Sequence, residues 1–141
     1  EINTSMPEYV LERTARALNR HGKSLKGSKA LVLGLSYKAD IDDDRESPSF
    51  EIIERLRAAG ADVAYCDPYI PVARPGREHD IRLSSVPCTA EEFARHDVLV
   101  VCTAHSDFKI AGLYAGVRLV ASALTFVSTV PLTPIEALAR A

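Results

Sequence analysis

Two cationic side chains, Lys38 and Arg45, stand seven positions apart in a short segment crowded with acids. Lysine and arginine both offer charge-assisted hydrogen bonds, so two of them in one loop suit a phosphate or carboxylate ligand. The same cations could instead neutralise the acids around them, and their spacing alone leaves both interpretations open. The acids are Asp40, Asp42, Asp43, Asp44 and Glu46. They do not predict a metal site, because the run lacks the glycine and the distal glutamate of a calcium loop.

The elements that flank this segment place it at one edge of a sheet. Lys29–Leu35 is a compact apolar run, typical of a strand covered on both faces. Ser47-Pro48 predicts the start of a helix, and Gly60 predicts its end. With a second strand at Asp62–Cys66, the unit is strand, helix, strand, which implies a parallel pair with a right-handed crossover. Ligands of open α/β sheets bind outside the carboxyl ends of the strands, where the cationic pair would lie.

The rest of the chain continues the alternation of helices and strands. Capping boxes, which predict helix starts, occur at Ser5–Glu8, Thr89–Glu92 and Thr133–Glu136. The first helix should end near His21, with Gly22 in the left-handed closing position. Further strands are expected at Asp97–Thr103 and Val117–Ala121, and an irregular surface excursion at 68–87. The expected fold class is therefore α/β: a three-layer α/β/α, open, mainly parallel, Rossmann-like sheet, preceded by an N-terminal linker helix.

The overall composition argues against several classes of protein. A chain of 141 residues with a net charge of −2 fits one globular domain and gives no electrostatic reason to expect nucleic acid. No apolar run is long enough to cross a membrane, and no signal peptide is evident. The chain opens on Glu1 and enters a helical pattern at once, so we expect it to be part of a longer protein.

The three cysteines, Cys66, Cys88 and Cys102, are odd in number and include no CxxC pair. This pattern favours a reducing compartment over a disulfide framework, and hence a cytoplasmic protein. Cys66 and Cys102, which close strands, are expected to be small buried hydrophobes. Cys102 and His105 are close in sequence, but two ligands make a poor metal site.

The turn after the first strand, residues 34–38, is neither G-x-G-x-x-G nor a P-loop. The backbone cradle for a pyrophosphate is therefore missing, and autonomous dinucleotide binding is not expected. Asp67 ends the second strand, where a Rossmann domain would carry its ribose-binding acid. Because Pro68 follows, Asp67 is more simply interpreted as a turn initiator.

Three segments in order carry a specific resemblance to a known family. They are G-L-x-Y-K at 34–38, D-D-x-R-E-S-P at 42–48 and D-P-Y-x-P at 67–71. With them, residues 2 to about 110 resemble the carboxyl-terminal domain of the UDP-glucose/GDP-mannose dehydrogenase family. The stretches at 77–79 and 83–86 look closest to its UDP-N-acetylglucosamine 6-dehydrogenase branch. Residues 2–7 look like the end of the helix that joins this domain to the family's central region.

The resemblance implies an enzyme that oxidises the C6 alcohol of a UDP-sugar to a carboxylate in two NAD-dependent steps, in polysaccharide biosynthesis. In the family, the catalytic cysteine and the glycine-rich NAD fingerprint lie in earlier domains, so no catalytic residue is assigned here and the isolated domain should be inactive. By position, Tyr37 and Lys38 would contact the sugar nucleotide, and Arg45 would reach NAD across the domain cleft. Residues 1–27 would end the inter-domain, dimerisation helix and its connector, and 28–141 would form the UDP-sugar-binding domain. The implied partners are the substrate, the enzyme's N-terminal and central domains, and further copies in a homo-oligomer.

The carboxyl-terminal tail departs from the family pattern. The family usually ends its last strand with an Asp-Thr-Arg-like segment whose arginine also holds the substrate. Here residues 119–124 contain neither an acid nor an arginine, and Glu136 and Arg140 are the only charges from Leu119 onward. The alternative is therefore a non-catalytic, Rossmann-like assembly or regulatory module that has lost full substrate binding.

Overall fold

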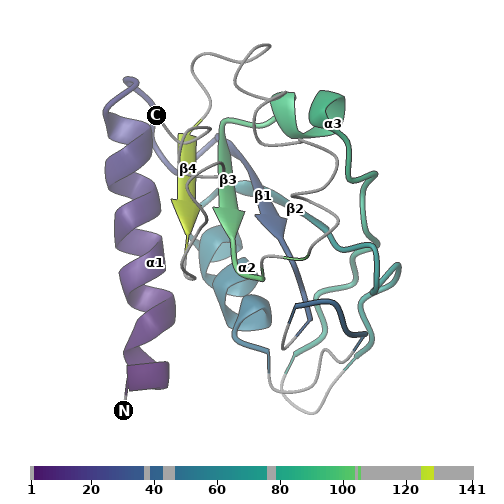
Figure 1. Ribbon diagram of the computed structural model, residues 1–141. Coiled ribbons are helices and arrows are strands. Elements are labelled where there is room, and N and C mark those ends of the chain that lie inside the picture. The colour runs from purple at the N-terminus through teal and green to yellow at the C-terminus, as the bar shows by residue number, and fades with distance from the viewer. Residues whose placement is uncertain are drawn as a thin grey trace.

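The computed structural model describes residues 2–36, 39–42, 47–75, 79–103, 105 and 125–128. In this part of the chain three helices alternate with four strands (Figure 1). The elements are α1 (Ile2–Asn19), β1 (Lys29–Leu33), α2 (Ser49–Ala58), β2 (Asp62–Cys66), α3 (Ala90–Ala94), β3 (Val98–Val101) and β4 (Thr125–Ser128). None of these helices combines the length and the apolarity needed to span a bilayer.

The four strands form one sheet in the order β2-β1-β3-β4, and every pair is parallel (Figure 1). The chain moves outward from β1 to β2 and then returns to the opposite side of β1 to form β3. The strand order therefore reverses between β1 and β3, which is the topological switch point of such sheets. The expected strand at Val117–Ala121 lies outside the described residues, and the sequence did not indicate the strand at Thr125–Ser128.

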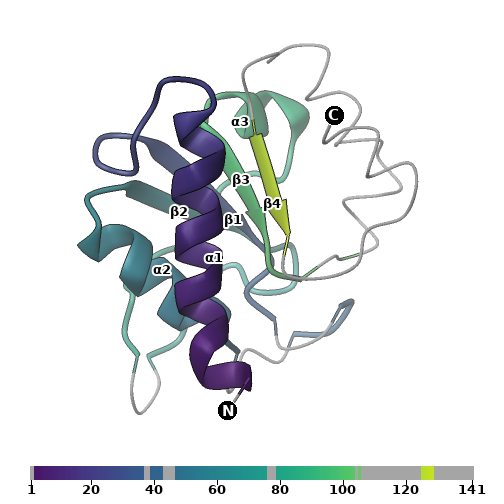
Figure 2. The same ribbon diagram turned by 90° about the vertical axis from the view of Figure 1, so that its left-hand side faces the viewer.

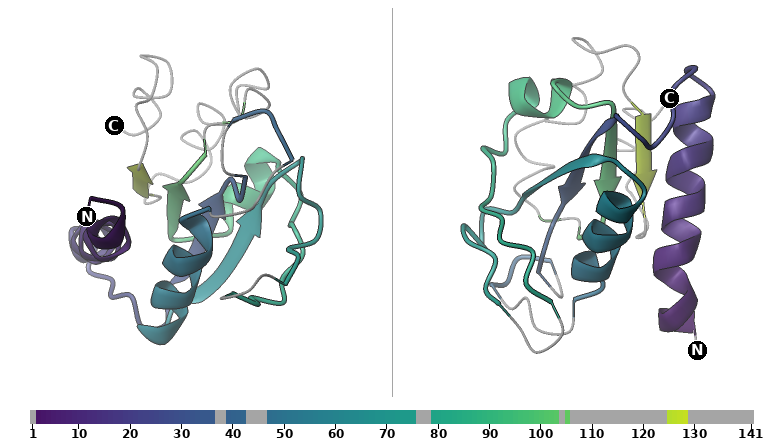
Figure 3. Two further views of the ribbon diagram at one scale, coloured as in Figure 1. Left: turned by 90° about the horizontal axis from the view of Figure 1, so that it is seen from below. Right: turned by 180° about the vertical axis from the view of Figure 1, so that it is seen from behind.

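Helices cover both faces of the sheet, as the three-layer prediction required. Helices α1 and α2 lie on one face and α3 on the other (Figures 2 and 3). Alternate residues of β1 separate into two cores: Ala30 and Val32 pack under α1 and α2, whereas Leu31 and Leu33 pack with Phe93 of α3. All four strand residues have no exposed surface, which explains the unbroken apolar run of this strand.

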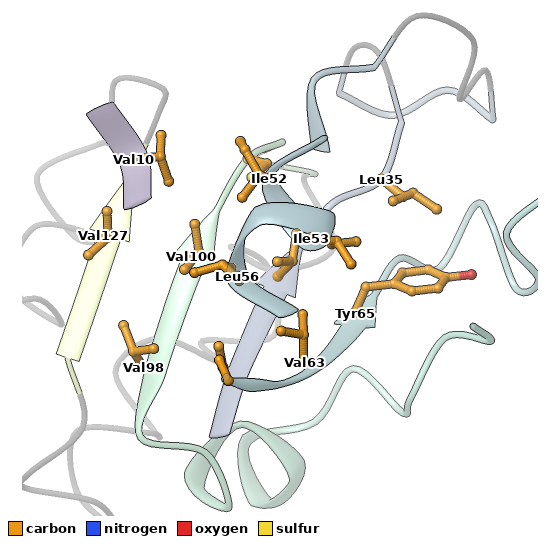
Figure 4. Packing of buried hydrophobic residues seen from close by; sticks show 14 of the residues in the cluster. Val10, Leu35, Ile52, Ile53, Leu56, Val63, Tyr65, Val98, Val100 and Val127 are labelled. Carbon is orange, nitrogen blue, oxygen red and sulfur yellow. The ribbon is translucent and has the colours of Figure 1, made fainter. Parts of the chain in front are cut away.

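The larger core joins α1 and α2 to the sheet (Figure 4). Val10 comes from α1, and Ile53 and Leu56 come from α2. They meet Val100 and Val127 from β3 and β4, and all five side chains are at most 2% exposed. The helix that precedes the first strand is thus packed on the sheet rather than held apart from it.

The start of α1 differs from the prediction. The helix begins at Ile2, so the capping box expected at Ser5–Glu8 does not open it, and Pro7 lies within the helix. Proline lacks an N–H, so its position removes one backbone hydrogen bond from the second turn, while the following turns continue. The helix ends at Asn19, and Gly22 (φ 71°) closes it as expected, with Lys23 N–H donating to Leu18 O at 3.0 Å.

The starts and ends of α2 and α3 follow their sequence signals, whereas the helix predicted from Thr133–Glu136 lies outside the described residues. Thr89 caps α3 by accepting from Glu92 N–H at 3.2 Å, as its capping box predicted. Helix α2 begins one residue after Pro48, and Ser47 Oγ accepts from Ser49 N–H at 3.3 Å. Gly60 adopts φ 96° just beyond the helix, in the closing position expected for it.

The expectation that the cysteines are unpaired is wrong for two of them. Cys66 and Cys88 form a disulfide, with their Cα atoms 5.6 Å apart. The segment before α3 returns alongside β2, where Val86 N–H donates to Tyr65 O at 2.9 Å, and this brings the two cysteines together. A separation of 22 residues without a recognisable motif carried no sign of this pairing. Cys102 lies outside this disulfide and is buried as expected, and burial raises the pKa of its thiol to about 12.

Candidate functional site at the carboxyl edge of the sheet

The residues that follow β1, β2 and β3 meet at the carboxyl edge of the sheet. At the switch point the backbone after β1 approaches the backbone after β3 so closely that a Cβ on Gly34 would lie 2.6 Å from Thr103 O. Gly34 also has φ 92°, which L side chains rarely adopt. Two independent constraints therefore require glycine directly after β1: the positive φ and the closeness of the neighbouring backbone.

A buried carboxylate organises this edge. Asp67 has no exposed surface, and its Oδ2 accepts hydrogen bonds from Leu35 N–H at 2.7 Å and Ser36 N–H at 2.9 Å. Its Oδ1 accepts from Tyr69 N–H at 2.8 Å. Burial alone would raise the pKa of Asp67, but the hydrogen bond from His105 and those from the backbone outweigh it and lower the pKa below 3.8. Asp67 is therefore an anion held by internal donors.

A further donor to Asp67 is His105, which is also fully buried. Its Nε2 lies 2.9 Å from Asp67 Oδ2, and its Nδ1 accepts from the backbone N–H of Asp40 at 2.7 Å. Because Nδ1 accepts, the ring proton is on Nε2, so the imidazole is neutral and donates to Asp67. The ring of Tyr69 packs against the imidazole at 4.7 Å between centroids.

The loop that leaves β1 is fastened on both sides of positions 37 and 38. Before them, Ser36 is held by Asp67, and Ser36 O accepts from Thr103 Oγ1 at 2.7 Å. After them, Asp40 is held by His105, and Ile41 O accepts from the Ser36 hydroxyl at 2.6 Å. Ser36 and Thr103 are buried, whereas residues 39–42 are exposed. The base of the loop is therefore polar and buried, and its rim, residues 39–42, is exposed.

The three site residues predicted from the sequence, Tyr37, Lys38 and Arg45, lie outside the described residues. Their roles, and the alternative that the cations only neutralise nearby acids, therefore stay predictions. Ser36, immediately before Tyr37, lies at the switch point, which agrees with the edge expected for this loop.

The structure decides between the two interpretations of Asp67. Its Oδ1 accepts from the N–H two residues on, which is the hydrogen bond of a turn initiator, and the absence of exposed surface leaves no room for a ribose. The role of His105 was missed. A histidine four residues after a buried strand was the available signal, because this segment follows the edge of the sheet where Asp67 also lies. Among the described residues no group of three metal-ligating side chains is found.

Comparison with known proteins identifies the family of the segment that forms this edge. The family model described as "UDP-glucose/GDP-mannose dehydrogenase family, UDP binding domain" matches residues 31–127, which include the end of β1, all of β2 and β3, and the loop between Gly34 and Ser47. The chain belongs to the UDP-glucose/GDP-mannose dehydrogenase family.

Individual members of this dehydrogenase family show the same likeness. The chain is 26% identical to the UDP-N-acetyl-D-glucosamine 6-dehydrogenase of Salmonella typhi over 111 residues, covering 79% of this chain and 25% of that protein. It is 33% identical to the UDP-N-acetyl-D-mannosamine dehydrogenase of Methanococcus maripaludis over 109 residues, covering 77% and 23%.

A crystal structure extends the likeness to the fold. The NDP-N-acetyl-D-galactosaminuronic acid dehydrogenase of Methanosarcina mazei superposes with a TM-score of 0.70 and 26% identity, covering 88% of this chain and 29% of that chain. This chain therefore spans about a quarter of the length of the dehydrogenases that it matches.

Proposed function

We propose that this chain is the carboxyl-terminal, UDP-sugar-binding domain of an NAD-dependent UDP-sugar 6-dehydrogenase. The complete enzyme would oxidise the C6 alcohol of its substrate to a carboxylate by two hydride transfers, in the biosynthesis of a surface polysaccharide. Residues 1–27 would be the end of the joining helix with its connector, and 28–141 the binding domain. The chemistry and most of the NAD contacts would come from the enzyme's other domains, and the enzyme would work as a homo-oligomer.

This proposal rests on the location of the loop that contains position 38. It leaves β1 at the switch point, within the segment that matches the family's UDP binding domain. Open α/β sheets bind nucleotides at this position, and a fastened loop can present side chains to a ligand with little loss of conformational freedom on binding. Relatives named for UDP-N-acetylglucosamine and UDP-N-acetylmannosamine agree with a UDP-linked sugar as substrate.

Each predicted residue has a role suited to its chemistry. Lys38 would supply a compact positive charge to a polar or anionic group of the sugar nucleotide, and Tyr37 would contact the same ligand. The planar fork of Arg45 suits the pyrophosphate or carboxamide region of NAD. Asp67 and His105 are excluded from ligand contact in this proposal, because both are fully buried.

The test is NADH formation by the intact protein that contains this chain. UDP-N-acetylglucosamine, UDP-N-acetylmannosamine and UDP-glucose would be supplied in turn, with GDP-mannose as the comparison substrate. We expect NADH with at least one UDP-sugar, two per sugar oxidised. Lys38→Ala should lower kcat/KM about ten- to a hundredfold, the scale of one charge-assisted hydrogen bond of about 1.5–3 kcal/mol. Lys26→Ala, on the exposed connector at the opposite edge, is the matched control and should change nothing.

Arg45 provides a separate arm of this test. Arg45→Ala should raise the KM for NAD and leave the KM for the UDP-sugar near its original value. Wild-type kinetics in both Lys38→Ala and Arg45→Ala would remove the loop from the active site and refute the proposed binding site.

The second candidate is the non-catalytic assembly or regulatory module. It is favoured by the tail, in which Arg140 is the only arginine after Arg118. A module would not form NADH with any of these sugars, and no UDP-sugar would shift its thermal unfolding.

The proposed location is the cytoplasm, where NAD is available as an oxidant. The Cys66–Cys88 disulfide is the opposing observation, because disulfides persist mainly in oxidising compartments. Counting free thiols in protein purified without reductant separates the two, since a disulfide formed in the cell leaves one thiol of three.

A further inference from the structure

The pair formed by His105 and Asp67 does more than fill the core. A histidine that only balanced a buried carboxylate would need one ring nitrogen at Asp67. Here the second nitrogen, Nδ1, accepts the backbone N–H of Asp40, which is 65 residues away in sequence and lies on the exposed rim of the loop. The imidazole therefore connects the anchored end of β2 to the far side of positions 37 and 38.

The loop backbone at this contact has a conformation that needs support. Asp40 has φ 64°, in the left-handed region that non-glycine residues rarely adopt, although aspartate adopts it more readily than most. Such a conformation persists where the surrounding structure holds it. The hydrogen bond from Asp40 N–H to His105 is a direct restraint on that residue, and the Tyr69 ring packed on the imidazole limits the freedom of the acceptor.

We infer that His105 is a positioning residue for UDP-sugar binding: anchored by Asp67, it fixes Asp40 and thereby the three-residue span that contains Tyr37 and Lys38. This inference rests on the proposed function, in which Lys38 contacts the sugar nucleotide. The span is held before its first residue by Asp67 and Thr103, and after its last by His105. Releasing one end would remove a restraint on the loop, and the ligand would then have to supply that restraint on binding.

Two substitutions separate the two hydrogen bonds of the imidazole. The amide of glutamine reaches the position of Nε2, so His105→Gln keeps the donor to Asp67 and loses the acceptor for Asp40. The amide of asparagine reaches the position of Nδ1, so His105→Asn keeps the acceptor for Asp40 and loses the donor to Asp67. If His105 has only a structural role, losing its hydrogen bond to Asp67 should have the larger effect. If His105 positions the loop, losing its hydrogen bond to Asp40 should weaken ligand binding.

The experiment is calorimetric titration of the intact protein with UDP-N-acetylglucosamine. His105→Gln should raise Kd about tenfold, and His105→Asn should leave it within about threefold of wild type. A variant that folds incompletely binds at fewer sites without a change in Kd, so the stoichiometry reports folding separately. His79→Gln, which removes a half-buried histidine paired with Glu54 away from this loop, is the matched control and should bind as wild type does.

A double-mutant cycle with Lys38→Ala completes the test. If His105 acts through Lys38, the double variant should bind no more than about twofold more weakly than Lys38→Ala alone. Three outcomes would overturn the inference. The losses of affinity from His105→Gln and Lys38→Ala could multiply in the double variant, His105→Gln could keep the wild-type Kd, or the two His105 variants could lose affinity equally. A wild-type Kd in Lys38→Ala would instead refute the proposed site, and the role of His105 with it.

Discussion

Two aspartates lie at opposite edges of the sheet, and their charges are stabilised in different ways. At the amino edge, Asp97 bonds Lys23 Nζ at 2.7 Å and Lys29 N–H at 2.8 Å, and its side chain is 28% exposed. At the carboxyl edge, Asp67 has no exposed surface and bonds three backbone N–H groups and a neutral imidazole. Both carboxyl groups have a lowered pKa, against burial that would raise it.

The difference lies in what each carboxylate holds. Asp97 ties the connector before β1 to the start of β3 through a flexible ammonium group, a contact that water can partly replace. Asp67 is bound by the backbone of the loop that follows β1, so its charge is satisfied only when that loop is in one conformation. The contacts of Asp97 join two segments at the amino edge, whereas those of Asp67 also fix the conformation of a loop at the carboxyl edge.

The largest expected effect is the loss of the buried carboxylate. Asp67→Ala leaves Leu35 N–H, Ser36 N–H and the imidazole without their acceptor, and should lower the free energy of unfolding by about 3–5 kcal/mol. Asp97→Ala, the matched change at the other edge, should lower it by about 1 kcal/mol. Urea unfolding of both variants measures the two values. Equal losses would contradict the distinction between the edges.

Next in size is the disulfide that joins the end of β2 to the segment before α3. Cys88→Ser should lower the free energy of unfolding by about 3 kcal/mol, as expected for a bridge that closes a loop of 22 residues. Reduction of the wild-type protein should give the same loss of stability, and Cys88→Ser should then be insensitive to reductant. Three free thiols in unreduced, denatured protein would show that the bridge does not form.

Two glycines with positive φ allow a matched test of the close backbone contact. Gly34→Ala should destabilise the protein by about 2 kcal/mol more than Gly22→Ala, because a Cβ at Gly34 meets Thr103 as well as an unfavourable φ. At Gly22, in the connector at the amino edge, a Cβ would have no atom within 4 Å. Thermal unfolding of the two variants measures the difference, and equal shifts would refute the steric contribution.

The smallest effect is the response to acid. The pKa of Asp67 is lower in the folded protein than its unfolded value of about 3.9, so the unfolded chain takes up the proton first. This contribution is present above that value and is lost as the pH falls through the folded pKa. Asp67→Asn should therefore show a shallower loss of stability below about pH 4 than wild type. Urea midpoints measured from neutral pH downward test this, and parallel profiles would contradict it.

The sequence predicted the helices and strands better than the long-range contacts that hold them together. The strand at 29–33, the helix after Ser47-Pro48 and the cap at Thr89 each rest on local signals, and the structure contains all three. The pairing of Cys66 with Cys88, the contact between Asp67 and His105, and the strand at Thr125–Ser128 depend on which distant segments meet. No local pattern encodes those meetings. The family resemblance located the candidate loop, yet the residues that hold its base became evident only from their geometry.

The donors to Asp67 also bear on how the protein folds. Leu35, Ser36 and His105 lie 31 to 38 positions from it in the chain, so the carboxylate keeps its water until β1, β2 and β3 are side by side. We therefore expect this group to lose its water late in folding, after the transition state. Changes at Asp67 should accelerate unfolding and leave the refolding rate nearly constant. The contacts at the carboxyl edge would then slow the unfolding of the assembled sheet.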